Sequence, residues 1–223
     1  MCVSVIIPAF NEQQRIKTTI ETAFSLEHVS EVIVVDDGST DKTYQEAIQT
    51  KATVFQLAAN QGKGAALNQG INRANSDIFL LLDADVGESA IEAQKLLTPV
   101  LEGEMDMTVA KFPTAEQKGG FGVVKTLAAW GVKKITGQSF SAPLSGQRVL
   151  TKDVIKAVDK FAPGFGVEVA LTIAAWQAGF KIQEIPVQMY HRFTTRDWSG
   201  FWHRGQQFKD IAFVLASLIR RGN

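Results

Sequence analysis

The chain has 223 residues, of which 45% are hydrophobic and 21% charged, and this composition is typical of one globular domain with a sizeable core. Lys and Arg number 23, as do Asp and Glu, so the net charge is zero and no overall field favours nucleic acid as a partner. The single cysteine, Cys2, excludes an intrachain disulfide and a cysteine-based zinc site, which fits a reducing compartment such as the cytoplasm. We expect no secretory signal, because "MCVSVIIPAF" lacks a positively charged n-region and a long apolar h-region. We expect no membrane span, because no apolar run reaches about 18 residues.

Short β-branched runs alternate with longer amphipathic stretches along the first hundred residues. In chain order the pattern predicts strand, helix, strand, helix, strand, helix and strand over residues 3–9, 11–26, 31–37, 41–50, 52–58, 62–74 and 77–84. A helix near 91–102 and a strand near 106–112 continue the series. This alternation predicts an α/β fold with a mostly parallel central sheet, right-handed crossovers and helices on both faces.

Polar residues cluster directly after each of the first four predicted strands. The clusters are "PAFNE" (8–12), "DDGSTD" (36–41), "NQGKG" (60–64) and "DAD" (83–85). In a doubly wound sheet the carboxyl ends of parallel strands form one rim, where ligands bind. Carboxylates, amides, glycines that admit close backbone approach and a lysine for phosphate together predict a pocket for a nucleotide diphosphate held through a metal.

Each cluster taken alone has a simpler interpretation. Asp83 and Asp85 are equally typical of a helix cap or a solvated turn. Asn11 and Glu12 could open a helix, and Ser39 could cap the next one. What favours a ligand site is the occurrence of all four clusters along one rim.

The segments "VIIPAFNE", "VVDDGSTD", "NQGKGAALNQG" and "LLLDADV", in this order and spacing, resemble the nucleotide-sugar-binding half of glycosyltransferase family 2, with the GT-A fold. The later segments "APLSGQRVL" (142–150), "FAPGFGVEVAL" (161–171) and "YHR" (190–192) are similar to the glucosyl-3-phosphoglycerate synthases, a retaining group. The sequence also resembles the dolichyl- and polyprenyl-phosphate sugar synthases. The resemblance implies one GT-A domain over 1–223. Its parts would be a donor-binding half, an acceptor-side half and a C-terminal segment with a metal ligand and an amphipathic helix, at 1–112, 113–190 and 191–223.

The resemblance also implies roles for individual positions. The donor would be a nucleotide-diphosphate sugar, with UDP-glucose as the nearest choice. The positions expected to bind it are Pro8, Ala9, Glu12, Asp36, Asp37, Ser39, Lys63, Asp83, Ala84, Gly146 and Arg192. Mg²⁺ or Mn²⁺ would be held by Asp85 as the principal ligand, with Asp83 and His191. The positions expected beside the reacting sugar are Asp85, Glu168, Leu144 and Ser145.

Two of these residues have alternatives that the sequence leaves open. Glu168 would hold sugar hydroxyls as in the retaining synthases, or act as a general base as in inverting relatives, or simply favour a helix N-terminus. His191, judged from the sequence without the resemblance, is more typical of a surface or core histidine than of a metal ligand. The stereochemical outcome is therefore open, and the resemblance favours retention.

The expected acceptor is a phosphorylated small molecule or a lipid phosphate. The synthases grip phosphoglycerate with an arginine and a threonine after a glycine pair, where this chain has Gly122 and Val124. Phe165 and Met189 replace a tyrosine and a second arginine of that group. Without these partners a buried carboxylate acceptor would lose charge-assisted hydrogen bonds, which argues against 3-phosphoglycerate.

The last part of the chain, from about 191 to 223, mixes aromatic and basic side chains and leaves two alternatives. It could rest on a membrane surface that presents a lipid phosphate, or pack its apolar face on the domain or on a second copy in a homodimer. The stretch 119–135 is similarly either a lid or an interfacial helix.

The favoured function is that of a metal-dependent glycosyltransferase, in which a cation neutralises the charge that develops on the leaving nucleoside diphosphate. The alternative is a non-catalytic nucleotide-sugar-binding domain that serves as a regulatory or scaffold partner. A nucleotidyltransferase is disfavoured, because "PAFNEQQR" lacks a basic glycine-rich signature after the first strand.

Overall fold

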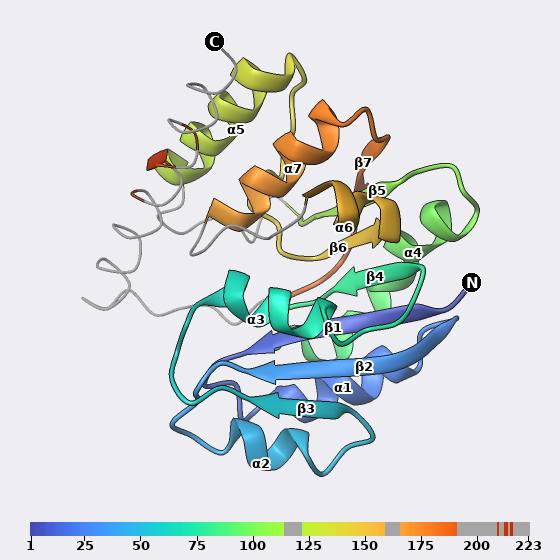
Figure 1. The fold of residues 1–223 in the computed structure, drawn as a ribbon, viewed down its shortest axis with the longest axis vertical. Coiled ribbons are helices and arrows are strands. Elements are labelled where there is room, and N and C mark those ends of the chain that lie inside the picture. Colours follow the sequence, from blue (N-terminus) through green and yellow to red (C-terminus); the bar gives the residue numbers. More distant parts are fainter. Residues whose placement is uncertain (114–121, 159–165, 191–208, 210–211, 214, 216–223) are drawn as a thin grey trace.

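The computed structural model describes residues 1–113, 122–158, 166–190, 209, 212, 213 and 215. Its centre is a seven-stranded sheet in the order β3-β2-β1-β4-β6-β5-β7 (Figure 1). The strands are β1 (Val3–Ala9), β2 (Val29–Asp36), β3 (Thr53–Gln56), β4 (Ile78–Leu81), β5 (Met107–Lys111), β6 (Arg148–Thr151) and β7 (Ile182–Pro186). The helices are α1 (Ile16–Phe24), α2 (Thr43–Ala47), α3 (Lys63–Ile71), the 3₁₀ helix η1 (Gly87–Ala93), α4 (Gln94–Leu101), α5 (Gly122–Thr136), α6 (Lys152–Val158) and α7 (Val167–Gln177).

The sheet is mostly parallel, as the sequence predicts. Strand β1 pairs in parallel with β2 and β4, and β2 with β3, while β6 runs antiparallel to both β4 and β5. Because β1 lies between β2 and β4, the strand order reverses there, and this switch point is where an open α/β sheet accommodates ligands.

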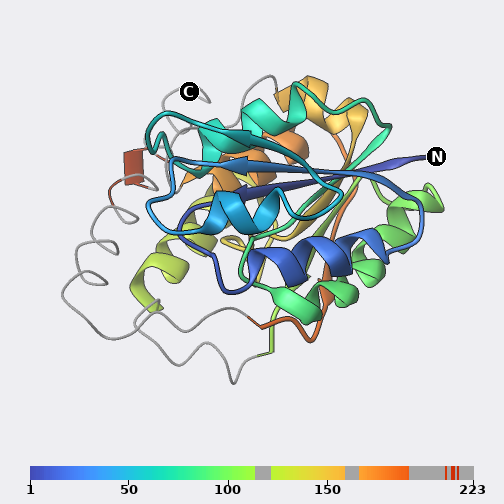
Figure 2. The same ribbon diagram turned by 90° about the horizontal axis from the view of Figure 1, so that it is seen from below.

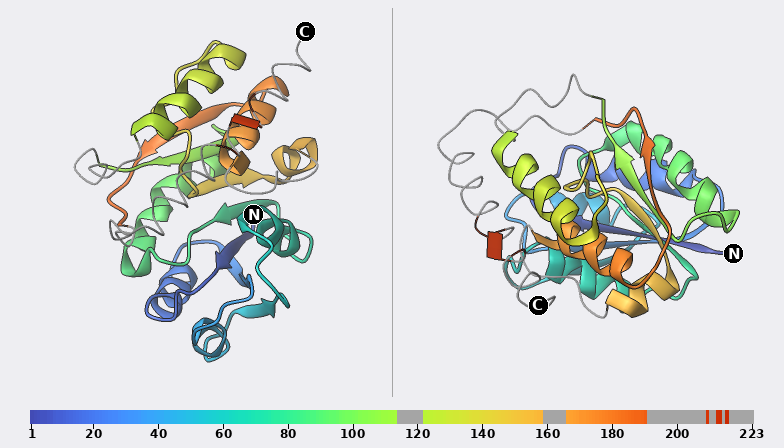
Figure 3. Two further views of the ribbon diagram at one scale, coloured as in Figure 1. Left: turned by 90° about the vertical axis from the view of Figure 1, so that its left-hand side faces the viewer. Right: turned by 90° about the horizontal axis from the view of Figure 1, so that it is seen from above.

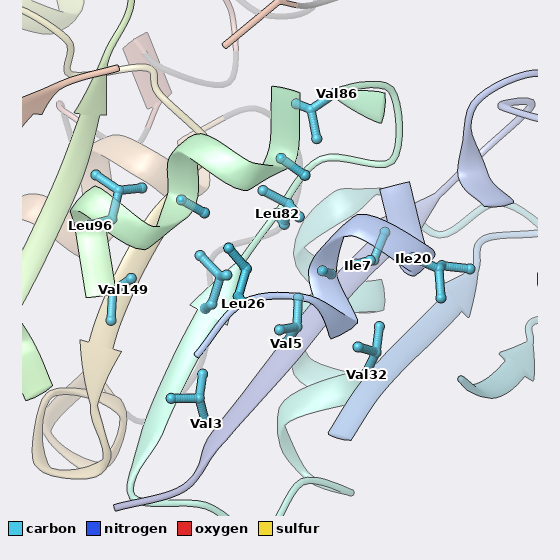
Figure 4. Packing of buried hydrophobic residues seen from close by; sticks show 14 of the residues in the cluster. Val3, Val5, Ile7, Ile20, Leu26, Val32, Leu82, Val86, Leu96 and Val149 are labelled. Atoms are coloured by element: carbon cyan, nitrogen blue, oxygen red, sulfur yellow. The ribbon is translucent and has the colours of Figure 1, made fainter. Parts of the chain in front are cut away.

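Two layers of helices cover the sheet, because successive residues of each strand point to opposite faces. On one face Val3, Val5 and Ile7 of β1 pack with α1, η1 and α4, and Figure 4 shows this cluster closely. On the other face Ile6 packs with α3, and β5 and β6 pack with α6 and α7. Figure 2 shows the two layers on either side of the sheet. The prediction of helices on both faces is confirmed.

A third, smaller apolar cluster joins α5 to α7, which lie side by side (Figure 3). Val124, Ala128 and Val132 of α5 take part in it, and so does Leu215, which is 3% exposed. A Cβ added at Gly131 would lie 2.3 Å from the Leu215 Cδ1. The side chain of Leu215 therefore packs on the domain, which agrees with one of the two alternatives for the C-terminal segment.

The structure corrects several predicted boundaries. Helix α1 begins at Ile16 and not at residue 11, because Asn11 has a left-handed φ of 57° and accepts a hydrogen bond from the Thr40 N–H at 2.9 Å through its side-chain oxygen. The predicted helix near 91–102 is a 3₁₀ helix followed by α4. Strands β6 and β7 were not predicted from the sequence. Among the described residues, none of the helices is both long and apolar enough to cross a membrane.

Candidate active site

The predicted rim exists at the carboxyl ends of β1, β2 and β4. The loops that follow these strands contain the clusters at 8–12, 36–41 and 83–85. The antiparallel strand β6 brings a further segment to this rim, because its first residue, Arg148, pairs with Leu81 at the end of β4. The residues directly before β6 therefore reach the same rim.

At the centre of the rim, one ammonium group bridges two carboxylates. The Lys63 Nζ lies 2.7 Å from Asp83 Oδ1 and 3.0 Å from Glu168 Oε1. The side chains of Lys63, Asp83 and Glu168 are 27%, 24% and 11% exposed, so the cluster is largely buried but still accessible to solvent. It joins residues from the start of α3, the end of β4 and the first turn of α7. Three predicted site residues thus lie together.

Gly146 lies against this cluster, and its lack of a side chain is required there. A Cβ at this position would be 2.3 Å from Lys63 Nζ and 2.8 Å from Asp83 Oδ2. The next residue, Gln147, is fully buried and donates from Nε2 to Asp83 Oδ2 at 2.7 Å. Both oxygens of Asp83 therefore have protein partners.

The charge state of Lys63 is set by its neighbours. Burial favours the neutral amine, but the carboxylates of Asp83 and Glu168 outweigh it and raise the pKa of Lys63 above its usual value. The lysine is accordingly a cation at any physiological pH.

The loop that carries Asp85 is fixed by side chains of α1. Thr19 donates from Oγ1 to the Ala84 carbonyl at 2.9 Å and accepts from the Gly87 N–H at 2.9 Å. The Arg15 Nη1 donates to the Asp85 carbonyl at 3.1 Å. These contacts determine the path of the main chain through both aspartates.

The two aspartates at the end of β2 use their carboxylates to shape neighbouring loops. Asp36 is fully buried and accepts from the hydroxyl and N–H of Ser39 and from Gln56 Nε2, the last at 2.8 Å. Asp37 is 3% exposed and accepts from the N–H groups of Gln61 and Gly62 at 2.7 and 2.8 Å. A nucleobase contact by either residue stays a prediction.

The first rim loop is tied to the second. The Asn11 N–H donates to the Ser39 Oγ at 2.9 Å, and the Glu12 N–H donates to the Thr43 Oγ1 at 2.7 Å. Pro8 is half-buried, while Ala9 is 2% exposed and its carbonyl accepts from the N–H of the residue that begins the second loop. These contacts hold the walls of the predicted base and ribose site together.

The loop with Leu144 and Ser145 is held from β7 by a residue that the sequence analysis missed. Glu184 accepts from the Ser141 N–H and hydroxyl at 2.9 and 2.6 Å, and from the Ala142 N–H at 2.6 Å. Leu144 packs against the cluster between α5 and α7, and Ser145 is 9% exposed. A carboxylate in a short strand has no distinctive sequence pattern, so only the fold reveals this contact.

The expected metal ligands are described only in part. Asp83 is engaged by Lys63 and Gln147 on its two oxygens, and metal binding by Asp83 or Asp85 stays a prediction. Across residues 1–113, 122–158 and 166–190, no group of three or more His, Cys, Asp or Glu side chains is arranged to hold a metal. His191 and Arg192 lie outside the described residues, as does Phe165.

The chain that leads to His191 is nonetheless anchored beside the aspartate loop. The Gln188 N–H donates to Glu92 Oε2 at 2.8 Å, and the Tyr190 N–H donates to the Ser89 Oγ at 3.1 Å. Both acceptors belong to η1, which begins two residues after Asp85. Residues 188 and 190 therefore lie next to the segment that carries the principal candidate ligand.

Comparisons with known proteins agree with this geometry. The model of glycosyl transferase family 2 matches residues 4–158. The glucosyl-3-phosphoglycerate synthase of Mycolicibacterium smegmatis is 31% identical over 77% of this chain and 63% of that protein. The undecaprenyl-phosphate 4-deoxy-4-formamido-L-arabinose transferase of Proteus mirabilis is 35% identical over 45% of this chain and 34% of that protein. The crystal structure of the Mycobacterium tuberculosis synthase with Mn²⁺, UDP-glucose and phosphoglyceric acid has a TM-score of 0.81 at 26% identity, covering 97% of this chain and 79% of that chain.

The fold and the rim together define a glycosyltransferase of the GT-A type. The chain belongs to glycosyltransferase family 2, whose model covers well over half of it. The chain spans 63% of the length of the M. smegmatis synthase.

Proposed function

We propose that this chain transfers a hexose from a nucleotide-diphosphate sugar, with UDP-glucose as the proposed donor, to a phosphorylated acceptor in a metal-dependent reaction. The observation that carries the proposal is the cluster of Lys63, Asp83 and Glu168 against Gly146, at the rim where the central parallel strands end. Ionised carboxylates held by an ammonium group are suited to accept hydrogen bonds from sugar hydroxyls. The donor half is proposed at 1–112 and the acceptor half at 113–190.

The proposed cation is Mg²⁺ or Mn²⁺, with Asp85 as principal ligand and with Asp83 and His191 as the other protein ligands. Carboxylate oxygens suit hard divalent cations, and an added imidazole favours Mn²⁺ over a site made of oxygen alone. The anchoring of Tyr190 on Ser89 supports His191 in this role. The M. tuberculosis synthase, crystallised with Mn²⁺ and UDP-glucose, is a further support. When bound, the cation supplies positive charge to the leaving diphosphate.

The protein's own part in transfer is to hold the sugar while its bond to the diphosphate breaks. Glu168 and Asp83 would fix sugar hydroxyls, and the main chain at Leu144 and Ser145 would face the anomeric carbon. An acceptor oxygen then bonds to that carbon as the nucleoside diphosphate leaves, with Arg192 proposed to meet its phosphates. We propose retention of configuration, on the resemblance to the synthases.

The acceptor is proposed to differ from phosphoglycerate. Val124 and Met189, at positions where the synthases have polar side chains for that acceptor, are 5% and 0% exposed and belong to apolar clusters. A threonine in place of Val124 would bury a hydroxyl and an arginine in place of Met189 would bury a charge, so the packing here is built around apolar residues. Another phosphorylated small molecule or a lipid phosphate is the proposed class. The name of the P. mirabilis relative supports the lipid alternative.

The rival function is a non-catalytic domain that binds nucleotide sugars. The test measures UDP released from UDP-glucose in Mn²⁺ by the wild type, Asp85→Asn and Glu168→Gln. Each protein is assayed with and without a panel of phosphorylated small molecules and polyprenyl phosphate. The proposal predicts UDP release that an excess of EDTA stops and that both variants lose by about 10²-fold or more. UDP-glucose binding by a folded wild-type protein that releases no UDP with any acceptor would favour the rival.

A further inference from the structure

Arg148, the first residue of β6, is 1% exposed, yet it is charged, and no role was assigned to it within the segment 142–150. Its guanidinium donates from Nε to the Ser145 carbonyl at 2.8 Å and from Nη2 to the Pro143 carbonyl at 3.2 Å. The third contact runs from Nη1 to the Thr172 Oγ1 at 2.7 Å. One planar group thus holds the loop before β6 and the middle of α7 in a fixed relation.

The contacts made by this guanidinium close a ring through the central cluster. The Thr172 hydroxyl donates to the Glu168 carbonyl at 2.9 Å, and the carboxylate of Glu168 reaches the Lys63 Nζ at 3.0 Å. On the other side, Gln147, adjacent to the arginine in the chain, binds the Asp83 carboxylate. A shift of the loop or of α7 is therefore transmitted to both carboxylates of the site.

Packing alone does not account for an arginine at this position. Burial lowers the pKa of Arg148 to about 10, and the carboxylates of Glu168 and Glu184, which face it from α7 and β7, oppose that decrease. An apolar residue of similar volume often replaces a buried charge with little loss of stability. What an apolar residue cannot do is hold two carbonyls and a hydroxyl in one plane.

We propose that Arg148 is a positioning residue for sugar transfer. It sets the distance between the main chain at 143–146 and the first turn of α7, and so keeps Glu168 at the spacing that the bound sugar requires. This role rests on the proposed function, because it concerns the sugar end of the same site. The nucleotide end, formed by the loops after β1 and β2, makes no described contact with the guanidinium.

The test compares Arg148→Met, Arg148→Lys and Thr172→Val with the wild type in Mn²⁺. The methionine fills the volume, the lysine keeps the charge without the planar fork, and the valine removes only the link to α7. We expect kcat to fall about 10²-fold in both arginine variants and about 10-fold in Thr172→Val, as for misplacements of about 1 Å. The Kd for UDP, measured by calorimetry, should change by less than about threefold. Arg73→Met is the control, since Arg73 is exposed and contacts Gln69 and Phe55, away from the cluster.

The outcomes separate this role from a merely structural one. All rates are measured well below each variant's Tm, so that a loss of kcat in folded protein with intact UDP binding supports positioning. A lower Tm with wild-type kcat in Arg148→Lys and Thr172→Val would overturn it, and so would a loss confined to KM and the Kd for UDP with kcat unchanged. If Arg148→Met does not fold, the kcat and the Kd for UDP of Arg148→Lys and Thr172→Val test the role. Absence of turnover by the wild type would overturn the proposed function, and this role with it.

Discussion

Replacing Gly146 by alanine should damage the site while leaving the fold nearly intact. The new Cβ would lie 2.3 Å from Lys63 Nζ and 2.8 Å from Asp83 Oδ2, so reaching a contact of about 3.4 Å requires the ammonium to move by about 1.1 Å and the carboxylate by about 0.6 Å. The tip of a lysine yields easily, and Gly146 is not among the glycines with a left-handed φ, so the backbone tolerates a side chain. Because alanine also restricts the unfolded chain, we expect the free energy of unfolding to change by no more than about 1 kcal/mol.

Activity should respond differently from stability in this variant. The ammonium group is displaced from Asp83 and Glu168 by about 1 Å, a misplacement that can cost about 10²-fold in rate. The assay is Mn²⁺-dependent release of UDP from UDP-glucose, together with thermal unfolding. Gly131→Ala is the matched control, because its Cβ would also lie 2.3 Å from a flexible side chain, that of Leu215. Wild-type turnover by a folded Gly146→Ala protein would refute the reasoning.

Three further predictions concern the support of the site. Thr19→Val removes two hydrogen bonds to the loop around Asp85, so the free energy of unfolding should fall by about 1–3 kcal/mol in urea titrations and Mn²⁺ affinity should fall with it; an unchanged midpoint would contradict this. The pKa of Glu92 is lowered, chiefly by the Lys95 ammonium, so its carboxylate stabilises the fold above about pH 4.5 and this contribution is lost as the pH falls. Glu92→Gln should therefore lower stability by no more than about 1 kcal/mol at pH 7 and by less at pH 3, and equal losses at both pH values would disprove it. Lys63→Met leaves the carboxylates of Asp83 and Glu168 without their shared cation, so its Tm at pH 7 should lie below that of the wild type in calorimetric melting, and an unchanged Tm would contradict this.

The rim could be predicted because its signals are local. A buried parallel strand is an apolar run, and the polar residues that follow it mark where it ends; the prediction for β1 matches the structure at both ends. Four such ends in one parallel sheet meet at one edge whatever the loop details. Asp83 and Lys63 were therefore placed on one rim from their positions alone, and the ion pair that they form in the structure was not predicted.

The remaining contacts could not be predicted because they depend on distant pairings. Strand β6 has four residues and gives no periodic signal, yet its antiparallel pairing with β4 brings Gln147 to Asp83 across 64 positions. The start of α1 was misplaced because the left-handed backbone at Asn11 depends on a side-chain contact with the loop after β2. Sequence patterns describe one element at a time, whereas these features arise where elements meet.

The central claim is that this rim binds a nucleotide sugar through a metal. Isothermal calorimetry with UDP, GDP, UDP-glucose and GDP-mannose, each in Mn²⁺ and in EDTA, tests it most directly, with Asp85→Asn and Arg73→Met measured in parallel. We expect UDP and UDP-glucose to bind the wild type and Arg73→Met in Mn²⁺, and we expect EDTA or Asp85→Asn to weaken this binding by about tenfold or more. Folded wild-type protein that binds none of the four compounds, or binds them equally well in EDTA, would contradict it.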